Sequence, residues 1–261
     1  MSADGEAPAR LRRIRVTLSY DGTNYHGWQV QPETVTIQRT IEGVLAEIEG
    51  SPVKVAASGR TDTGVHALAQ VAAFTITNPI PVDNLRKAMN RLLPPDIRVV
   101  DAREAAADFH PRFQAKAKTY EYRIWRPEIC PPFERLYTYH YPFLLDERRV
   151  LALAPLFIGE YDFSAFAAAD EKYELAEFAK RSMVRTIYAS SAERRGDLLI
   201  YRVRGSGFLK HMVRNIVGVL LEVGKGNLGS ADIEARLQPG CGIPSGPTVP
   251  GRGLFLIGVE Y

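Results

Sequence analysis

The chain has 261 residues, of which 46% are hydrophobic and 24% charged, and its formal net charge is +3. These values are typical of a folded globular protein and exclude a wholly disordered chain. At about 150 residues per domain, the length accommodates one large or two modest domains.

Cysteine usage and hydropathy narrow the class of protein further. Cys130 and Cys241 are too few for a disulfide framework, and no metal-ligand spacing surrounds them. The start of the sequence has no signal-peptide pattern, and the longest apolar stretch is too short to span a bilayer. We therefore expect a cytoplasmic protein with no membrane partner.

Hydrophobic periodicity predicts the elements of a first α/β half. Ile14, Val16 and Leu18 alternate with polar residues, which indicates a half-buried strand. A helix is expected next, capped by Thr34 or Thr36. Further strands are expected near 52–57, 68–77 and 96–104, with a helix near 82–93.

A second half repeats this rhythm more loosely. Strands are expected near 116–125, 181–191, 197–204 and 254–261, and helices near 146–156, 209–223 and 230–237. The β-α-β-β-α-β order of the first half is that of a ferredoxin-like or RNA-recognition sheet. We therefore predict an α+β fold of two ferredoxin- or RRM-like halves, 13–109 and 110–261, around a central antiparallel sheet flanked by helices.

Positive charge is concentrated between Lys54 and Arg126, where there are twelve lysines and arginines against seven carboxylates. Such a local excess on a folded sheet favours a polyanion such as nucleic acid. Each of these residues taken alone also fits an ordinary solvated face.

The segment SGRTDTGVH, residues 58–66, is a loop rich in Gly, Thr and Ser with one carboxylate beside a guanidinium. Thr61 and Thr63 can hydrogen-bond the local backbone and fix the side chain of Asp62. Asp62 and Arg60 are therefore candidate site residues. The alternative is a turn in which Asp62 only satisfies backbone donors, which is the commoner use of Asp in such loops.

Aromatic and basic residues alternate in the expected strand over 116–123. Lys118, Tyr120 and Tyr122 share one face, and Glu121 belongs to the other. Rings beside cations suit an extruded base and its phosphate. The alternative is a plain strand with tyrosines inside and charges on a solvent face.

The expected helix over 209–223 carries Arg214 close to an apolar stripe, on a line with Lys210. The stripe consists of Met212, Val213, Ile216, Val217, Leu220 and Leu221. A partly buried Arg needs an anion, for which Asp62 is a candidate. The alternatives are a snorkelling side chain or a structural pair with another acid.

Six segments now indicate a family. They are YDGTNYHGWQVQP, ASGRTDTGVHALAQVAAF, FHPRFQAKAKTYEYRI, DFSAF, GFLKHMVRNIVG and the terminal GLFLIGVEY. In order and spacing they resemble the tRNA pseudouridine synthase A family from about residue 14 to residue 261. GRTD-x-GVH together with HMVRN is far more specific than a single short motif.

The resemblance implies both a reaction and its site residues. The reaction would isomerise uridines 38, 39 and 40 of the tRNA anticodon stem-loop, in a homodimer, with no metal and no small-molecule cofactor. Asp62 would be the nucleophile, Tyr120 would stack on the target base, and Arg214 would match the family arginine. Thr63 stands where Ala is more usual, and Lys210 precedes His211, which leaves the catalytic positions unchanged.

The remaining assignments concern contacts with RNA. Arg60 is expected to hold a flanking phosphate or to fill the space of the extruded base, because a guanidinium is planar and offers several donors. Leu254 and Phe255 are expected to line the uracil pocket. Two other functions stay open, a non-catalytic RNA-binding module and a glycosylase that releases free uracil.

Overall fold

The computed structural model describes residues 10–168 and 183–261 and divides the chain into two compact units. The first unit runs to Ala115 and includes Tyr261, and the second runs from Lys116 to Glu260. The first two residues of the strand expected near 181–191 lie outside the described residues.

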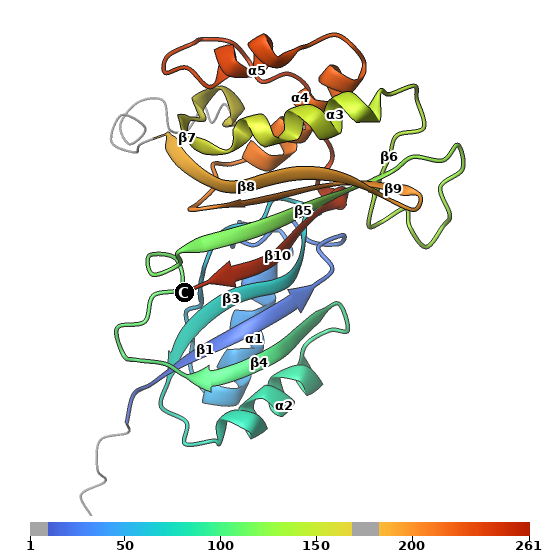
Figure 1. The fold of residues 1–261 in the computed structure, drawn as a ribbon. Helices are drawn as coiled ribbons and strands as arrows, with labels where there is room; N and C mark the ends of the chain where they lie inside the picture. The colour runs from blue at the N-terminus through green and yellow to red at the C-terminus, as the bar shows by residue number, and fades with distance from the viewer. Residues whose placement is uncertain (1–9, 169–182) are drawn as a thin grey trace, which may run out of the picture. The chain divides into compact units, whose positions relative to one another are not determined.

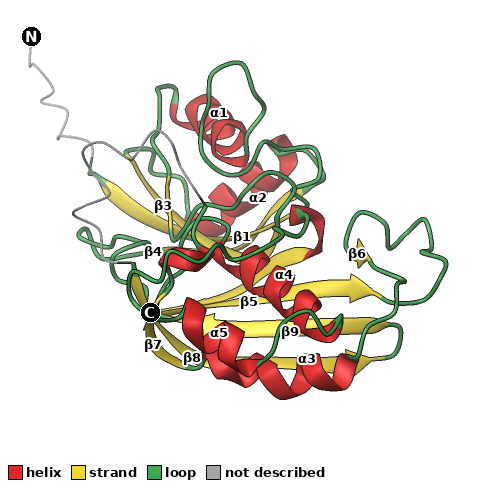
Figure 2. Ribbon diagram, turned by 90° about the horizontal axis from the view of Figure 1, so that it is seen from above, coloured by secondary structure: helices red, strands yellow, loops and turns green. Residues whose placement is uncertain are grey.

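The first unit follows the predicted β-α-β-β-α-β order. Its elements are β1 Arg12–Tyr20, α1 Ile37–Glu49, β2 Ala56–Ala57, β3 His66–Ile76, α2 Val82–Leu92 and β4 Ile97–Glu104. The strands are antiparallel neighbours in the order β4-β1-β3-β2. Helices α1 and α2 cover one face of these strands (Figures 1 and 2).

Local sequence explains most of these elements. Ile14, Val16 and Leu18 are fully buried against the helices, as their alternation predicts. Thr36 rather than Thr34 caps α1, since its hydroxyl accepts the Arg39 N–H at 3.3 Å.

The strand expected near 52–57 is reduced to Ala56–Ala57. Pro52 has no N–H to donate, and the Val55 N–H donates instead to the Glu42 carboxylate at 3.0 Å. The apolar residues of this stretch, Val53 and Val55, are buried although they do not pair with a neighbouring strand.

The second unit contains β5 Ala117–Trp125, β6 Tyr139–His140, α3 Glu147–Leu153, β7 Gly159–Asp162, β8 Val184–Arg195, β9 Leu198–Gly205, α4 Met212–Gly224, α5 Ser230–Arg236 and β10 Leu254–Glu260. Its main strands lie in the order β10-β5-β9-β8-β7, all antiparallel. Short β6 pairs with β5 in parallel. Helices α3, α4 and α5 lie on one face of β5, β9 and β8 (Figures 1 and 2).

The two units share one strand permutation. Leaving β6, β7 and α5 aside, β5-α3-β8-β9-α4-β10 repeats the order of the first unit, and β10-β5-β9-β8 corresponds to β4-β1-β3-β2. The predicted α+β class, with helices flanking antiparallel sheets, is confirmed. Strands β6 and β7 are additions that the periodicity did not indicate, because two and four residues are too short to show a period.

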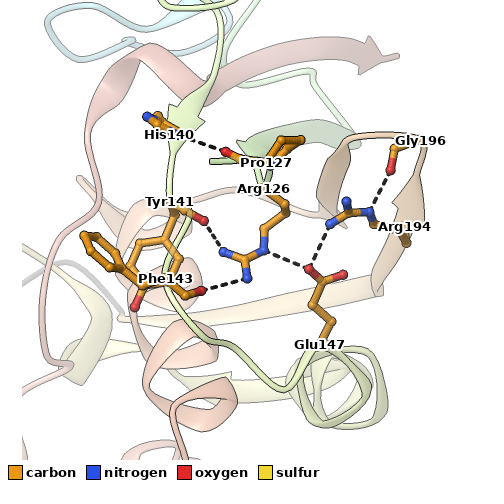
Figure 3. A network of polar contacts seen from close by, with 8 residues as sticks. All are labelled: Arg126, Pro127, His140, Tyr141, Phe143, Glu147, Arg194 and Gly196. Carbon is orange, nitrogen blue, oxygen red and sulfur yellow. Dashed lines mark hydrogen bonds and ion pairs between the residues drawn. The ribbon is translucent and has the colours of Figure 1, made fainter. Parts of the chain in front are cut away.

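An arginine fixes the long connection after β5 (Figure 3). The Arg126 Nε donates to Glu147 at 2.7 Å, and its other nitrogens donate to the carbonyls of Tyr141 and Phe143. Arg194 donates to the same Glu147 oxygen at 2.8 Å. One buried guanidinium thereby ties β5, the connection and α3 together.

No described helix has the length and apolar character needed to cross a membrane.

Candidate active site

The loop that carries Asp62 connects β2 and β3 and is fixed at its base. Ser58 donates from its backbone to the Val71 carbonyl at 2.8 Å and from its hydroxyl to Gln70 Oε1 at 2.5 Å. The Gln70 amide donates in turn to the Gly59 carbonyl at 2.8 Å. Buried Ser58 and Gln70 therefore anchor the loop, while Asp62 is half-buried further along.

Two glycines allow the segment before α1 to lie directly on this loop. A Cβ at Gly22 would be 2.0 Å from the Val65 carbonyl oxygen, and one at Gly27 would be 2.5 Å from that of Thr61. Gly27 also has a φ of +79°, a region that favours glycine. The Trp28 N–H donates to the Thr61 carbonyl at 3.0 Å. From the sequence this segment contributed only to the family resemblance, and the paired glycines are the signal for its role in supporting the loop.

Buried Tyr20, the last residue of β1, contacts the loop from the core side. Its hydroxyl lies 2.9 Å from Thr61 Oγ1, and burial raises the pKa of Tyr20 to about 12, so the phenol is neutral at pH 7. Thr61 thus directs its hydroxyl to the core instead of the local backbone, and Thr63 is exposed. We expected the hydroxyls of Thr61 and Thr63 to fix the side chain of Asp62, and the structure does not show this.

In the second unit, Tyr120 and Tyr122 share one face of β5, as expected. Tyr120 is 7% exposed, and its ring meets Phe208 edge-on with centroids 5.0 Å apart. Leu256 lies opposite Tyr120 in the ladder, and Leu254 lies opposite Tyr122. The structure therefore places Tyr120 and Leu254 two positions apart on one face.

The other face of β5, for which the sequence left a plain solvent-facing charge as one alternative, carries an ion-pair cluster. Glu121 is 5% exposed and accepts hydrogen bonds from Arg202 at 2.6 Å and Arg123 at 2.8 Å. Burial alone would raise the pKa of Glu121, but the two arginines outweigh it and hold that pKa below the ordinary value. The Arg123 guanidinium lies 3.9 Å from the centre of the Phe255 ring. The alternating pattern was read correctly, but neither Glu121 nor Phe255 faces open solvent.

Arg214 lies in the first turns of α4 and is half-buried, with Nε donating to the Val249 carbonyl at 2.8 Å. The predicted apolar stripe of this helix is buried throughout. Lys210 is not on the helix line with Arg214, because α4 begins only at Met212 and His211 has a left-handed φ of +62°. That expectation was wrong.

Asn215, next to Arg214, is a structural residue that sequence reasoning did not single out. It is 3% exposed, donates to the Phe166 carbonyl at 2.8 Å and accepts the Thr248 hydroxyl at 2.6 Å. A Cβ at Gly218 would be 1.8 Å from the Pro247 carbonyl oxygen, so the Pro- and Gly-rich segment 239–253 packs directly on α4 at Pro247. These contacts fix the backbone near Val249, whose carbonyl accepts the hydrogen bond from Arg214.

Each predicted site residue can now be assigned to a unit. Arg60 and Asp62 belong to the first unit, and Tyr120, Arg214 and Leu254 to the second. Arg60 is exposed, two residues before Asp62 on the same loop. The first unit thus offers a carboxylate on an anchored loop, and the second offers buried tyrosines on β5 and an arginine on α4, residue types that suit acid–base or nucleophilic chemistry on a nucleic acid.

Comparison with known proteins identifies the class. A family model described as tRNA pseudouridine synthase matches residues 17–114 and 153–261. The tRNA pseudouridine synthase A of Solibacter usitatus is 57% identical over 252 residues, covering 96% of this chain and 100% of that protein. Those of Geotalea uraniireducens and Halalkalibacterium halodurans are 44% and 42% identical, covering 96% and 94% of this chain and 100% and 91% of theirs.

The chain therefore belongs to the tRNA pseudouridine synthase family. It is an isomerase that binds RNA and has tRNA as its substrate. Among solved structures, the archaeal box H/ACA sRNP Nop10-Cbf5 complex is similar with a TM-score of 0.32 and 14% identity, covering 80% of this chain and 44% of that one. A likeness that distant carries no argument about this chain.

Proposed function

We propose that this enzyme converts uridines 38, 39 and 40 of the tRNA anticodon stem-loop to pseudouridine, with Asp62 as its nucleophile. The observation that carries the proposal is the Asp62 loop, whose base is held by Ser58 and Gln70. The segment with Gly22 and Gly27 packs directly on it. A carboxylate on a fixed loop supplies the nucleophile that the reaction requires.

The chemistry is an intramolecular transfer. The bond from C1′ to N1 of uracil breaks, the base rotates, and a bond from C1′ to C5 forms, while the C5 proton is lost and N1 gains a proton. Cleavage gives C1′ the character of an oxocarbenium ion, which a carboxylate stabilises or traps. Asp62 has three routes, namely attack at C1′, addition to C6 of the base, or removal of a sugar proton. All three start from the ionised carboxylate.

The other residues bind and orient the substrate in this proposal. A uridine in or beside a stem must be extruded before a carboxylate reaches it. Arg60 contacts the RNA next to the extruded nucleotide, and Tyr120 stacks on the base. Leu254 lines the uracil pocket, and Arg214 acts as a second catalytic residue. Residues 13–109 thus supply the nucleophile, and residues 110–261 supply the contacts with the base.

We further propose a cytoplasmic homodimer. An enzyme that modifies tRNA acts where tRNA is made and used. The connection after β5 exposes large apolar side chains, with Ile129 79%, Phe133 87% and Leu144 96% exposed, which supports a surface for a second copy. Sedimentation equilibrium at several concentrations tests this. A monomer at all concentrations, for the wild type as for Phe133→Ser, contradicts it.

Tritium release from C5-labelled uridine in tRNA is the direct test of the reaction. Transcripts with a single uridine at position 38, 39 or 40 should each release tritium, and a transcript with none of the three should release nothing. Release of free uracil would indicate a glycosylase, and RNA binding without release would indicate a binding module. Loss of activity on addition of a chelator would contradict catalysis without a metal.

A further inference from the structure

A small cavity of about 190 Å³ opens in the first unit beside the Asp62 loop. Strand β2 forms part of its wall, and the larger side chains that line it include Trp28, Gln29, Arg60, His110, Arg112 and Phe113. Its volume is below the range of about 300–1,000 Å³ that is common for pockets of drug-sized ligands. The cavity therefore suits one planar group such as a single nucleobase.

One wall is an aromatic pair on a rigid turn. The rings of His110 and Phe113 are stacked, with centroids 4.2 Å apart and planes inclined by 29°, and Phe113 is 79% exposed. His110 Nδ1 accepts the backbone N–H groups of Arg112 at 3.2 Å and Phe113 at 3.4 Å. Because Nδ1 accepts, the ring fastens the turn that presents Phe113. An exposed phenyl ring held in this way is a stacking platform for a base.

The polar groups of the cavity favour a negatively charged ligand that also has hydrogen-bond donors and acceptors. Arg60 and Arg112 supply positive charge, and no carboxylate side chain is among the lining residues. Within the described parts of the chain, Arg60 has no ion pair and the Gln29 amide has no hydrogen-bond partner. A nucleotide matches this set, since its phosphate meets a guanidinium and its base edge meets an amide.

The cavity is also mechanically coupled to the loop. Arg60 precedes Asp62 by two residues, a span of at most about 7 Å of chain. Trp28, on the cavity wall, donates to the Thr61 carbonyl at 3.0 Å. A ligand bound here therefore lies beside the loop that carries Asp62.

We propose that this cavity binds the unpaired base of the substrate nucleotide adjacent to the target uridine. The inference rests on the proposed function and deepens it, because a bound neighbour fixes the register of the RNA strand on the Asp62 loop. Its occupant is a loop nucleotide of the RNA, in contrast to a free nucleotide or an acidic peptide.

A double-mutant cycle between protein and RNA tests this proposal. Affinity is measured for stem-loop RNAs in which each loop nucleotide in turn is abasic, with wild type, Phe113→Leu and Phe113→Tyr. The wild type should lose about tenfold in affinity at one position, within the range for stacking of one base. Phe113→Leu should bind intact RNA about tenfold more weakly than wild type does. Its affinity should fall little further when that one position is abasic. Phe113→Tyr, which keeps the ring, should behave as wild type.

Tyr188→Leu is the matched control, because Tyr188 is 46% exposed with the Arg204 guanidinium 5.0 Å from its ring centre, but lies on β8. It should show the wild-type abasic profile. Equal losses in wild type and Phe113→Leu at every abasic position would overturn the proposal. Saturable binding of uridine monophosphate that Phe113→Leu abolishes, without any coupling to an abasic position, would also overturn it. Tritium release by the wild type on intact tRNA is measured separately, so failure of the isomerase function is distinguished from failure of the cavity.

Discussion

In the first unit the residues assigned to chemistry lie in the loop between β2 and β3, whereas in the second they lie within β5, α4 and β10. Both units use the same strand permutation, so topology alone does not decide where a site is built. The loop of the first unit is held by backbone contacts that glycines permit, at Gly22 and Gly27. The strand positions of the second unit are held by side-chain burial and ion pairs, as at Glu121.

This difference implies that changing a loop side chain such as Asp62 in the first unit affects function more than stability, whereas changing a strand side chain in the second unit can affect either. A side chain at the exposed part of a supported loop contributes little to the core. A side chain on a central strand packs on its neighbours whatever its chemical role. The variants below test this contrast.

Asp62→Asn should have the largest effect on turnover and almost none on folding. It keeps the shape of the side chain and removes the charge that the reaction needs. Pseudouridine formation should fall below detection, while tRNA affinity stays within about tenfold, or roughly 1.4 kcal/mol. Unfolding free energy should change by less than about 0.5 kcal/mol. Exposed Thr63→Ala is the control and should retain activity. Product formation by a pure Asn variant would refute the assignment.

Tyr120→Phe and Tyr122→Phe compare two tyrosines on one face of β5. Tyr120→Phe should keep most tRNA binding, since the ring remains, and lose much of its turnover if the hydroxyl handles a proton. Fully buried Tyr122 donates to the Pro250 carbonyl at 2.7 Å, so Tyr122→Phe should instead cost about 1–2 kcal/mol of stability. Chemical denaturation and single-turnover rates measure both. Wild-type turnover in Tyr120→Phe would confine that residue to stacking.

Gly27→Ala should damage the loop through the backbone. The new Cβ would meet the Thr61 carbonyl oxygen at 2.5 Å, at a φ of +79°. We expect a loss of about 2 kcal/mol in stability together with a drop in turnover, because the loop must shift. Gly50→Ala is matched, with a φ of +77° and nothing within 4 Å of its Cβ. It should cost about 1 kcal/mol without changing turnover. Equal turnover in both variants would show that close packing on Thr61 is dispensable.

Glu121→Gln should show how far an ion pair supports the second unit. Loss of charged hydrogen bonds to Arg123 and Arg202 should cost about 2 kcal/mol at pH 7. The pKa of Glu121 is lower in the folded state than its ordinary value of 4.5. Its contribution is therefore complete above pH 4.5 and disappears as the pH falls through the folded pKa.

Denaturation curves of wild type and Glu121→Gln should accordingly converge toward acid. Glu260→Gln is the control, because the Glu260–Arg204 pair is exposed at 50% and 40%. It should have a much smaller effect at every pH. A difference between wild type and Glu121→Gln that is constant with pH would exclude the ion pair as its source.

The sequence alone was sufficient to predict an element where hydrophobic periodicity or helix-capping residues mark it. The strand with Ile14, Val16 and Leu18 and the apolar stripe of α4 appear as predicted, and the helix cap is Thr36, one of the two threonines expected there. These features depend on residues within one turn or one strand of each other, which is the range over which periodicity carries information.

The sequence alone was insufficient to predict the role of a residue where contacts between distant segments set that role. Glu121 looks like a solvent-facing charge until Arg202, which is 81 positions away, is placed opposite it. Gly22 and Gly27 look like ordinary turn residues until the Asp62 loop is placed on them. Pairing of distant segments sets both roles, and a single sequence does not encode such pairing locally.

Tyr261 belongs to the first unit, although the second unit precedes it along the chain. Its hydroxyl donates to the Pro111 carbonyl at 2.7 Å, and its ring lies 4.3 Å from the Arg15 guanidinium and 5.2 Å from the centre of the Phe109 ring. During synthesis at about 5–20 residues per second, the first unit therefore waits at least several seconds for this one side chain. A released chain that ends at Glu260 should be more open to proteases around Phe109 than one that also carries Tyr261.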